Sequence, residues 1–409
     1  MSIIIQKYGG SSLATEEMRE AVAEKIVHAK RYGSKIVAVL SAIGRYPDPY
    51  ATDTLIRRIE EHGEPDPREK DLIMATGEIF SCITMKSIIQ AMGEEAVVLT
   101  GFQAGIVTDG THGDAKILSV DPSRILGFLE RNCIVLVAGF QGISRDKEIT
   151  TLGRGGSDTT ATALGAALGA ERVEIYTDVS GVMSADPRIY GGSQIIRELT
   201  YQEMGEMANE GAKVLHSRSV DISWQYHVPL WVKGTFSKDT GSFISSRKGA
   251  AMEKSLISGL IHRTEIDEFI LMLPPLEASG TLRRRLLEEL AGKRISLDLI
   301  NFCYEKFYFV TARTDSAAVE ECLRAFGICF SKKTGMAKIS CVGMGMKGTP
   351  GVMAAIQRAL HAAHIRIWRS VDSYITLSCL IDEASLPFAL EALHSAFGMV
   401  AKREEGIKA

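Results

Sequence analysis

The segment 151–160, Thr-Leu-Gly-Arg-Gly-Gly-Ser-Asp-Thr-Thr, places charged side chains among glycines at the start of a predicted helix. Arg154 carries a planar fork of donors that suits a carboxylate, and Asp158 can orient a cationic group. In a structural alternative, Ser157 or Asp158 is only the N-cap of this helix, which runs to about Leu168. Because a cap needs neither the arginine nor three glycines, we expect this loop to bind a ligand.

A second glycine turn, 7–12 (Lys-Tyr-Gly-Gly-Ser-Ser), follows the first apolar run of the chain. The glycines allow a ligand to approach the backbone closely, and the N–H groups that open the next helix favour anions. Lys7 stands just before the turn, where its ammonium group can reach a bound phosphate. A glycine pair after a strand is often only a tight turn, so both interpretations stay open.

The segment 177–188 also follows a predicted strand and mixes backbone donors with two acids and an arginine, which suits a nucleotide. The alternative is a plain loop closed by Asp186 and Pro187. Further on, Lys213 lies near a predicted helix, where a lone lysine is usually a surface residue.

Other ligand-binding patterns are missing from the sequence or too weak to use. No Walker motif G-x-x-x-x-G-K-[ST] occurs. Residues 343–348 match G-x-G-x-x-G, but the chain that follows is too short for a dinucleotide-binding domain. The histidines show no metal-ligand spacing, and the seven cysteines form no C-x-x-C pair, so we expect no zinc site.

The composition is that of an ordinary globular protein. The chain has 409 residues, of which 45% are hydrophobic and 24% charged, and this length predicts two or three domains. A net charge of -3 predicts neither a nucleic-acid nor a membrane partner. Scattered cysteines, no signal peptide and no segment that approaches a membrane span indicate a cytoplasmic protein.

The first 240 or so residues alternate short apolar runs with helical patterns, which predicts a mostly parallel sheet covered on both faces. The expected strands are 3–6, 35–40, 96–100, 134–138, 173–177 and 229–232, and the expected helices include 18–32, 69–92 and 122–131.

The last third of the chain contains an internal repeat. The apolar residues Leu286, Leu290, Ile295 and Leu297 recur at a shift of 70 residues as Ile356, Leu360, Ile365 and Ile367. Chance similarity between two amphipathic helices is the alternative. Because helix and strand keep one spacing, we expect two βαββα modules that begin with strands at 256–260 and 337–342.

Together these motifs resemble those of the aspartokinases, in the amino-acid-kinase family. The matching segments are 7–12, 75–78, 137–142, 151–160, 174–188 and 210–216. The resemblance implies an α/β fold: a three-layer αβα kinase domain with an eight-stranded, mostly parallel sheet over 1–245, a linker at 246–255, and two βαββαβ ACT (ferredoxin-like) modules. The modules span 256–336 and 337–409, and the C-terminal segment can complete the first.

The resemblance further implies that ATP, with Mg²⁺, phosphorylates the side-chain carboxylate of L-aspartate. The products are 4-phospho-L-aspartate and ADP, in the first step towards lysine or diaminopimelate, threonine and methionine. Arg154 would pair with the α-carboxylate of the substrate and Glu78 with its ammonium group. A carboxylate with a pKa of about 3.9 is already ionised at neutral pH, so alignment and charge stabilisation carry the reaction.

The site residues follow from the same resemblance. The aspartate site would comprise Gly9, Gly10, Ser41, Thr52, Glu78, Arg154, Gly155 and Ser157. The ATP site would comprise Lys7, Thr177, Asp178, Met183, Ser184, Asp186, Arg188 and Lys213. The catalytic residues would be Lys7, Asp158 and Lys213.

The chain also departs from the family pattern. Met183 stands where many members carry tyrosine, and residues 216–218 read His-Ser-Arg in place of His-Pro-Arg. The first module lacks the usual Pro-Gly loop at 274–280, whereas the second keeps it at 349–352. We therefore expect an effector, lysine or diaminopimelate, near Met344, Gly345, Thr349, Pro350, Gly351 and Val352, between the modules of two subunits of a homodimer.

Two alternatives compete with this interpretation. Another amino-acid kinase, acting on acetylglutamate or a uridine nucleotide, would generally lack the two-module tail. A catalytically silent amino-acid sensor would not need to retain the five residues Lys7, Glu78, Arg154, Asp158 and Lys213.

Overall fold

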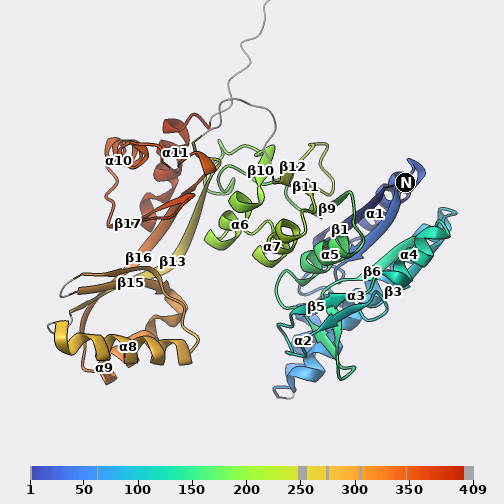
Figure 1. Ribbon diagram of the computed structural model, residues 1–409, viewed down its shortest axis with the longest axis horizontal. Coiled ribbons are helices and arrows are strands. Elements are labelled where there is room, and N and C mark those ends of the chain that lie inside the picture. Colours follow the sequence, from blue (N-terminus) through green and yellow to red (C-terminus); the bar gives the residue numbers. More distant parts are fainter. Residues whose placement is uncertain are drawn as a thin grey trace, which may run out of the picture. The chain divides into compact units, whose positions relative to one another are not determined.

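The computed structural model describes residues 2–61, 63–246, 256–272, 276–303, 306–346 and 348–399. These residues form two compact units, each described by itself below (Figure 1). The first unit comprises 1–182, 195–209 and 213–251, and the second comprises 183–194, 210–212 and 252–409. Two short pieces of the expected kinase segment, 183–194 and 210–212, thus belong to the second unit. Most of the predicted linker and the C-terminal segment 400–409 lie outside the described residues.

The first unit is built on an eight-stranded sheet in the order β10-β12-β11-β9-β1-β2-β6-β3. Its strand pairs are parallel except for β11 and β12, so the prediction of a mostly parallel sheet is confirmed. The strands are β1 (Ile3–Tyr8), β2 (Lys35–Leu40), β3 (Ala96–Leu99), β6 (Ile134–Ala138), β9 (Arg172–Thr177), β10 (Glu198–Thr200), β11 (Leu230–Gly234) and β12 (Ser242–Ser245).

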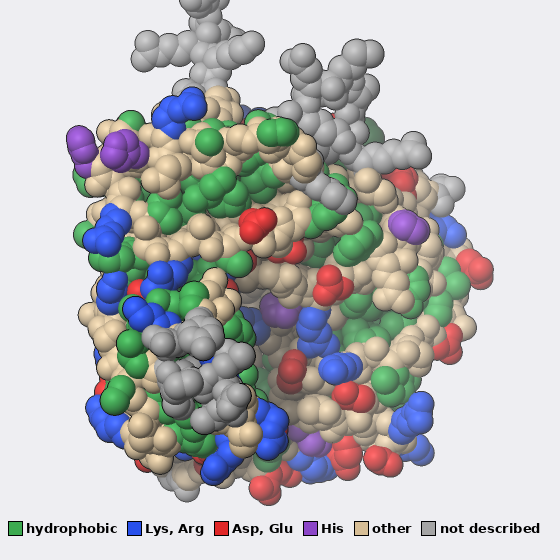
Figure 2. All heavy atoms as spheres, turned by 60° about the vertical axis from the view of Figure 1, so that its left-hand side comes forward, with side chains coloured by type: hydrophobic (Ala, Val, Ile, Leu, Met, Phe, Trp, Pro, Cys, Tyr) green, Lys and Arg blue, Asp and Glu red, His purple; other side chains and the backbone are tan. Residues whose placement is uncertain are grey.

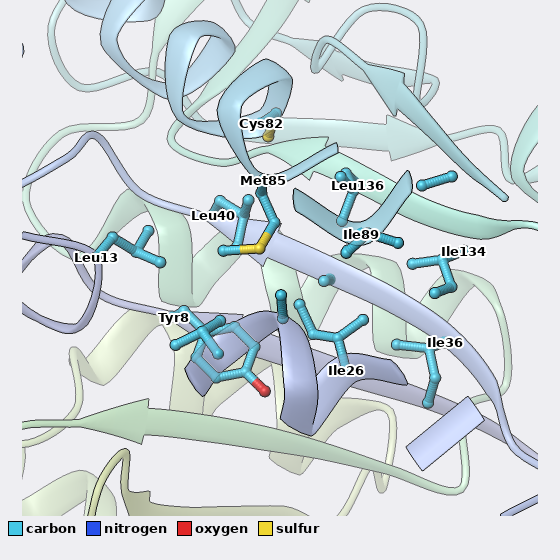
Figure 3. Close-up of a cluster of buried hydrophobic side chains, with 14 of the residues drawn as sticks. Tyr8, Leu13, Ile26, Ile36, Leu40, Cys82, Met85, Ile89, Ile134 and Leu136 are labelled. Atoms are coloured by element: carbon cyan, nitrogen blue, oxygen red, sulfur yellow. The ribbon is translucent and has the colours of Figure 1, made fainter. Parts of the chain in front are cut away.

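Helices cover both faces of this sheet, because its central strands are apolar on both sides. On one face, Tyr8 and Leu40 pack with Ile26 of α1 and Met85 of α3 in a fully buried cluster (Figure 3). On the other face, α5 approaches so closely that a Cβ on Gly165 would lie 2.5 Å from Val173. The helices are α1 (Glu16–Arg31), α2 (Thr52–Glu60), α3 (Pro67–Ala91), α4 (Ser123–Glu130), α5 (Gly156–Ala167), α6 (Tyr201–Glu210) and α7 (Ser217–Gln225). The three-layer αβα prediction is confirmed.

Helix α3 differs from the expectation that no segment approaches a membrane span, since its length and composition would allow one. However, 44% of its most apolar window is buried inside the fold, and its buried residues include Asp71 and Glu78. The helix contacts α1, α2 and the sheet strands β2, β3 and β6. We therefore interpret α3 as a core helix of the first unit.

A small four-stranded sheet, which the sequence patterns did not predict, completes the first unit. Its strands, in sheet order, are β5 (Ile117–Val120), β4 (Ile106–Thr108), β7 (Gln141–Ser144) and β8 (Ile149–Thr151). Buried Asp71 of α3 fixes its loops: Asp71 pairs with His112 at 2.7 Å and accepts hydrogen bonds from the Gly113 N–H and the Thr151 hydroxyl.

The second unit contains one six-stranded antiparallel sheet in the order β14-β15-β13-β16-β18-β17. Its first module is β13 (Gly259–Met272), α8 (Leu276–Gly292), β14 (Asp298–Phe302), β15 (Lys306–Ala312) and α9 (Ser316–Ala325). Its second is β16 (Cys329–Val342), α10 (Val352–Ala362), β17 (Arg369–Asp372), β18 (Thr376–Asp382) and α11 (Leu386–Ala396). The βαββα repeat is present, and pairing of the 14-residue strands β13 and β16 joins the modules into one sheet.

Short 3-10 turns complete the structure at η1 (Gly10–Ser12), η2 (Arg313–Asp315), η3 (Met344–Met346) and η4 (Glu383–Ser385). On the face that Figure 2 shows, basic and acidic side chains lie interspersed among apolar ones, in keeping with the small net charge.

Candidate active site

A cavity of about 370 Å³ lies in the first unit, next to the carboxyl ends of β1 and β2 and the start of α5. This is where open α/β sheets bind their ligands. The lining residues are Lys7, Gly9, Gly10, Ser11, Ser41, Ala42, Gly44, Arg45, Thr52, Glu78, Phe140, Gly153, Arg154, Gly155, Gly156, Ser157, Asp158 and Thr177. All eight residues predicted for the aspartate site are among them.

An ion pair connects the two glycine loops that the sequence singled out. Lys7 Nζ lies 2.7 Å from Asp158 Oδ1, and both side chains are about nine-tenths buried. Gly10 is required at its position, since a Cβ there would lie 2.5 Å from the Ala42 carbonyl oxygen. The loops therefore meet on one side of the cavity, with Lys7 held in place by its acidic partner.

The loop before α5 has an unusual backbone that explains two of its glycines. Gly153 and Gly155 adopt φ angles of 73° and 70°, which disfavour residues with a side chain. Gly155 is the N-cap, so the alternative that Ser157 or Asp158 caps the helix is wrong. Asp158 lies instead in the first turn, where the positive end of the helix dipole favours a carboxylate.

Glu78 offers a buried carboxylate that lacks a full set of partners. It is 3% exposed, and its Oε1 accepts a hydrogen bond from the Ala42 N–H at 3.2 Å. Its Oε2 has no hydrogen-bond partner among the described residues. Burial raises the pKa of Glu78 to about 8. A cationic group in the cavity would satisfy this oxygen and restore the ionised form.

Arg154 supplies the complementary charge. Its side chain is exposed and forms no ion pair with any described residue, although it lines the same cavity as Glu78. The site thus presents a guanidinium group and a buried carboxylate, the two groups that recognise the carboxylate and the ammonium group of an amino acid.

Several lining residues, among them Phe140, Arg45 and Gly44, were not among the predicted site residues. Phe140 stands between β6 and β7 with a φ angle of 69°, inside the motif 137–142. Arg45 lines the cavity and pairs with Asp178 at 3.0 Å. Gly44 has a φ angle of 77°, and a Cβ there would overlap the Asp48 side chain. The motif 137–142 could have indicated from the sequence that Phe140 lies at the site. No spacing of residues around Arg45 indicates the same for Arg45.

The residues predicted to bind ATP do not all lie at this cavity. In the first unit, Thr177 lines the cavity, and Asp178 is exposed beside Arg45. Lys213 is exposed, does not line the cavity and forms no ion pair with a described residue. Its catalytic role therefore stays a prediction that the cavity itself does not support.

The other four ATP candidates, Met183, Ser184, Asp186 and Arg188, belong to the second unit. Ser184 is buried, and its hydroxyl lies 2.9 Å from His394 Nε2 and accepts from the Gln194 N–H. Its backbone N–H donates to the Gln194 carbonyl, and its carbonyl accepts a hydrogen bond from the Leu260 N–H. The hydroxyl and backbone groups of Ser184 thus all form hydrogen bonds within the second unit, and its role in ATP binding stays a prediction.

Asp186 and Arg188 pair with each other in the same segment. Arg188 donates through its guanidinium group and its backbone N–H to the Asp186 carboxylate, with a shortest distance of 2.7 Å. These hydrogen bonds lower the pKa of Asp186. Met183 is half-buried.

The predicted effector loop lies between β16 and α10. Met344 and Gly345 belong to the turn η3, and the Thr349 hydroxyl donates to the Gly345 carbonyl at 2.8 Å. Pro350 and Gly351 follow, and Gly351 is the N-cap of α10, which begins at Val352 with a φ angle of 88° at its cap. The described residues of this loop are thus joined by a hydrogen bond and lead into a helix, while effector binding there stays a prediction.

Sequence comparisons agree with this geometry. The amino acid kinase family matches residues 2–234, more than half of the chain, and an ACT domain matches residues 339–397. The fold and the cavity therefore define a small-molecule kinase of the amino-acid-kinase class, with an ACT module in its C-terminal part.

Individual relatives narrow the class. The chain is 37% identical to Aspartokinase 1 of Bacillus subtilis, over 97% of this chain and 99% of the relative. It is 38% identical to the aspartokinase of Geobacillus stearothermophilus, over 98% of each. The crystal structure of Clostridium acetobutylicum aspartate kinase shares the fold, with a TM-score of 0.81 at 21% identity, over 96% of this chain and 100% of that one. The chain belongs to the aspartokinase family.

Proposed function

We propose that this chain uses ATP to phosphorylate the side-chain carboxylate of L-aspartate, giving 4-phospho-L-aspartate and ADP. The observation that carries the proposal is the cavity that Arg154, Glu78 and Lys7 share, in which Glu78 Oε2 has no hydrogen-bond partner in the described part of the chain. The Arg154 guanidinium group binds the α-carboxylate of the substrate, and the Glu78 carboxylate accepts a hydrogen bond from its α-ammonium group. The substrate side chain is then directed towards the glycine turn beside Lys7.

Phosphoryl transfer follows without a strong general base. An oxygen of the ionised side chain attacks the γ-phosphorus, the bond to the β,γ-bridging oxygen breaks, and ADP leaves with that electron pair. Lys7 offsets the charge of the transferring group, and the N–H groups near Gly10 and Gly156 add donors. Asp158 holds the Lys7 ammonium group in position through their ion pair.

Mg²⁺ fits this site as a companion of the nucleotide. Carboxylate oxygens suit Mg²⁺, and Asp158 lines the cavity, although Lys7 already pairs with it. The described residues contain no group of three metal-binding side chains, so the phosphates themselves would hold most of the ion. When bound, Mg²⁺ would neutralise phosphate charge.

The ACT modules would supply feedback control. The solved aspartokinase III of E. coli has been crystallised with lysine and aspartate. By analogy, lysine or diaminopimelate would bind near Gly345 and Thr349 in a homodimer, and the reaction would be the first step of the cytoplasmic pathway to lysine, threonine and methionine. Titration of each amino acid against turnover and thermal shift tests this assignment, and no response to any of them would refute it.

Replacement of Lys7 tests the catalytic assignment. Lys7→Ala removes the ammonium group beside the reacting phosphate, and we expect turnover to fall by at least about 100-fold. ADP release with aspartate and ATP is the measurement, with the exposed Lys116→Ala as matched control. Normal turnover in Lys7→Ala, or equal turnover with acetylglutamate, would contradict the proposal.

A further inference from the structure

Arg218, in the first turn of α7, contacts the segment that leads to the proposed substrate arginine. Its Nη1 donates to the Leu152 carbonyl at 2.6 Å, and its Nη2 donates to the Ala115 carbonyl at 2.7 Å. Leu152 precedes the glycine loop, and Ala115 is joined to the same segment because its N–H donates to the Thr151 carbonyl at 2.9 Å. One guanidinium group thus bonds two neighbouring segments of the backbone, at Leu152 and at Ala115.

The residue that caps α7 contacts the other end of the same loop. His216 packs so closely on Gly155 that a Cβ there would lie 2.3 Å from the His216 Cβ. The His216 imidazole Nδ1 accepts the Arg218 N–H at 3.4 Å, which fixes the start of the helix. The start of α7 therefore touches the loop just before Gly153 and again at Gly155, with Arg154 between them.

The loop needs such a support because little else restrains its arginine. Arg154 is exposed and has no ion pair among the described residues, so the backbone around it sets its position. That backbone contains two glycines in the left-handed region, where an unsupported chain has many accessible conformations. Arg218 restricts these conformations because its guanidinium group forms charge-assisted hydrogen bonds to carbonyl groups next to the loop.

We propose that Arg218 is a positioning residue for the substrate: it holds the 152–155 loop so that Arg154 meets the α-carboxylate of aspartate. The inference rests on the proposed function, since it assumes that Arg154 binds this carboxylate. Arg218 itself lies outside the cavity lining and does not touch the reacting groups.

The test compares the two Michaelis constants of Arg218→Gln. A misplaced Arg154 weakens aspartate binding, so we expect KM for aspartate to rise between about tenfold and a hundredfold. The KM for MgATP should stay within about twofold, because the Lys7–Asp158 pair does not depend on this loop carbonyl. A general loss of folding would instead lower the active fraction and leave both constants unchanged.

Matched variants separate the possible causes. Arg197→Gln removes a partly exposed guanidinium group that binds Thr240 and should leave both constants unchanged. Asp114→Asn removes the exposed partner of Arg218, at 3.1 Å, but keeps both carbonyl bonds, so it should have little effect. Arg218→Lys keeps the charge but reaches only one carbonyl, and its KM for aspartate should lie between those of the wild type and Arg218→Gln.

Each outcome decides the matter. An unchanged KM for aspartate in Arg218→Gln, with a wild type that turns over aspartate, would overturn this inference alone. A wild type without aspartate turnover would refute the proposed function, and this inference with it. If both Arg218 variants are unfolded by circular dichroism, Arg218 is a structural residue and the inference is wrong.

Discussion

At the scale of single residues, the site depends on the buried carboxylate of Glu78, which pairs with no cationic side chain of the residues that the structure describes. Desolvation raises the pKa of Glu78 to about 8, so the carboxyl group is mostly protonated at neutral pH when no cation lies beside it. Lys7 and Arg154 line the same cavity. The ammonium group of a bound substrate would favour the ionised form, and binding would then release a proton.

This linkage predicts a pH dependence of substrate binding. Between about pH 6 and 8, affinity for aspartate should rise with pH, by up to about tenfold per unit, because less work is needed to deprotonate Glu78. Calorimetry at pH 7 in buffers of different ionisation enthalpy should show release of nearly one proton. The isosteric Glu78→Gln should lose this dependence. Binding without proton release at pH 7 would contradict the assignment.

The same pKa shift has a consequence for stability. An acid whose pKa is higher in the folded than in the unfolded protein binds more protons when folded. The contribution of Glu78 to the free energy of unfolding therefore falls as pH rises from about 4.5 to 8. Urea unfolding of Glu78→Gln should show a flatter profile across this window. If the stability of Glu78→Gln depends on pH as that of the wild type does, a group other than Glu78 causes this dependence.

At the scale of elements, the turn after β1 depends on a close backbone approach. Gly10→Ala would bring a Cβ within 2.5 Å of the Ala42 carbonyl oxygen and 2.6 Å of the Gly44 carbonyl oxygen, both on the backbone. We expect the free energy of unfolding to fall by about 1–3 kcal/mol, together with loss of turnover.

Gly127→Ala is the matched control, because it lies inside α4 with nothing within 4 Å of the added Cβ. This change should stabilise the protein by up to about 1 kcal/mol. Urea unfolding of both variants gives the comparison, and equal stabilities would refute the close approach at Gly10.

The elements also show what the sequence could predict. Apolar runs such as Ile134–Ala138 are buried at every position, so their pattern predicts a strand of a covered parallel sheet. The glycine loops around Gly10 and Arg154 predicted a ligand site, because the carboxyl ends of the strands in such a sheet lie at the same edge. The three-residue strand Ile106–Thr108 was missed, since it is too short to show a period and is defined by its partners.

At the scale of the whole molecule, chain order and compact units do not coincide. The hydrogen bond between Ser184 and His394 joins residues 210 positions apart, and no local pattern predicts it. Similarly, Glu210, at the end of α6, belongs to the second unit, where it pairs with Lys338 at 2.9 Å. No local pattern could therefore indicate this environment of Ser184, and its role in ATP binding stays a prediction.

Lys338 provides a test of this organisation. It is 5% exposed in its side chain and pairs with both Glu210 and Asp298. Lys338→Met would remove the cation beside Glu210 and leave Asp298 with only the longer pair to Arg263, at 3.9 Å, and we expect the free energy of unfolding to fall by about 3 kcal/mol. Lys332→Met, on the same strand but 30% exposed beside Glu320, should cost less than about 1 kcal/mol. Equal effects in thermal unfolding would contradict the buried network.

The most direct test of the account is to trap the product. An acyl phosphate reacts with hydroxylamine to give a hydroxamate, so the purified protein is incubated with aspartate, MgATP and hydroxylamine. We predict aspartyl hydroxamate in the same molar amount as ADP, and neither product without aspartate. ADP formation that does not depend on aspartate, or that yields no hydroxamate, would contradict phosphorylation of the side-chain carboxylate.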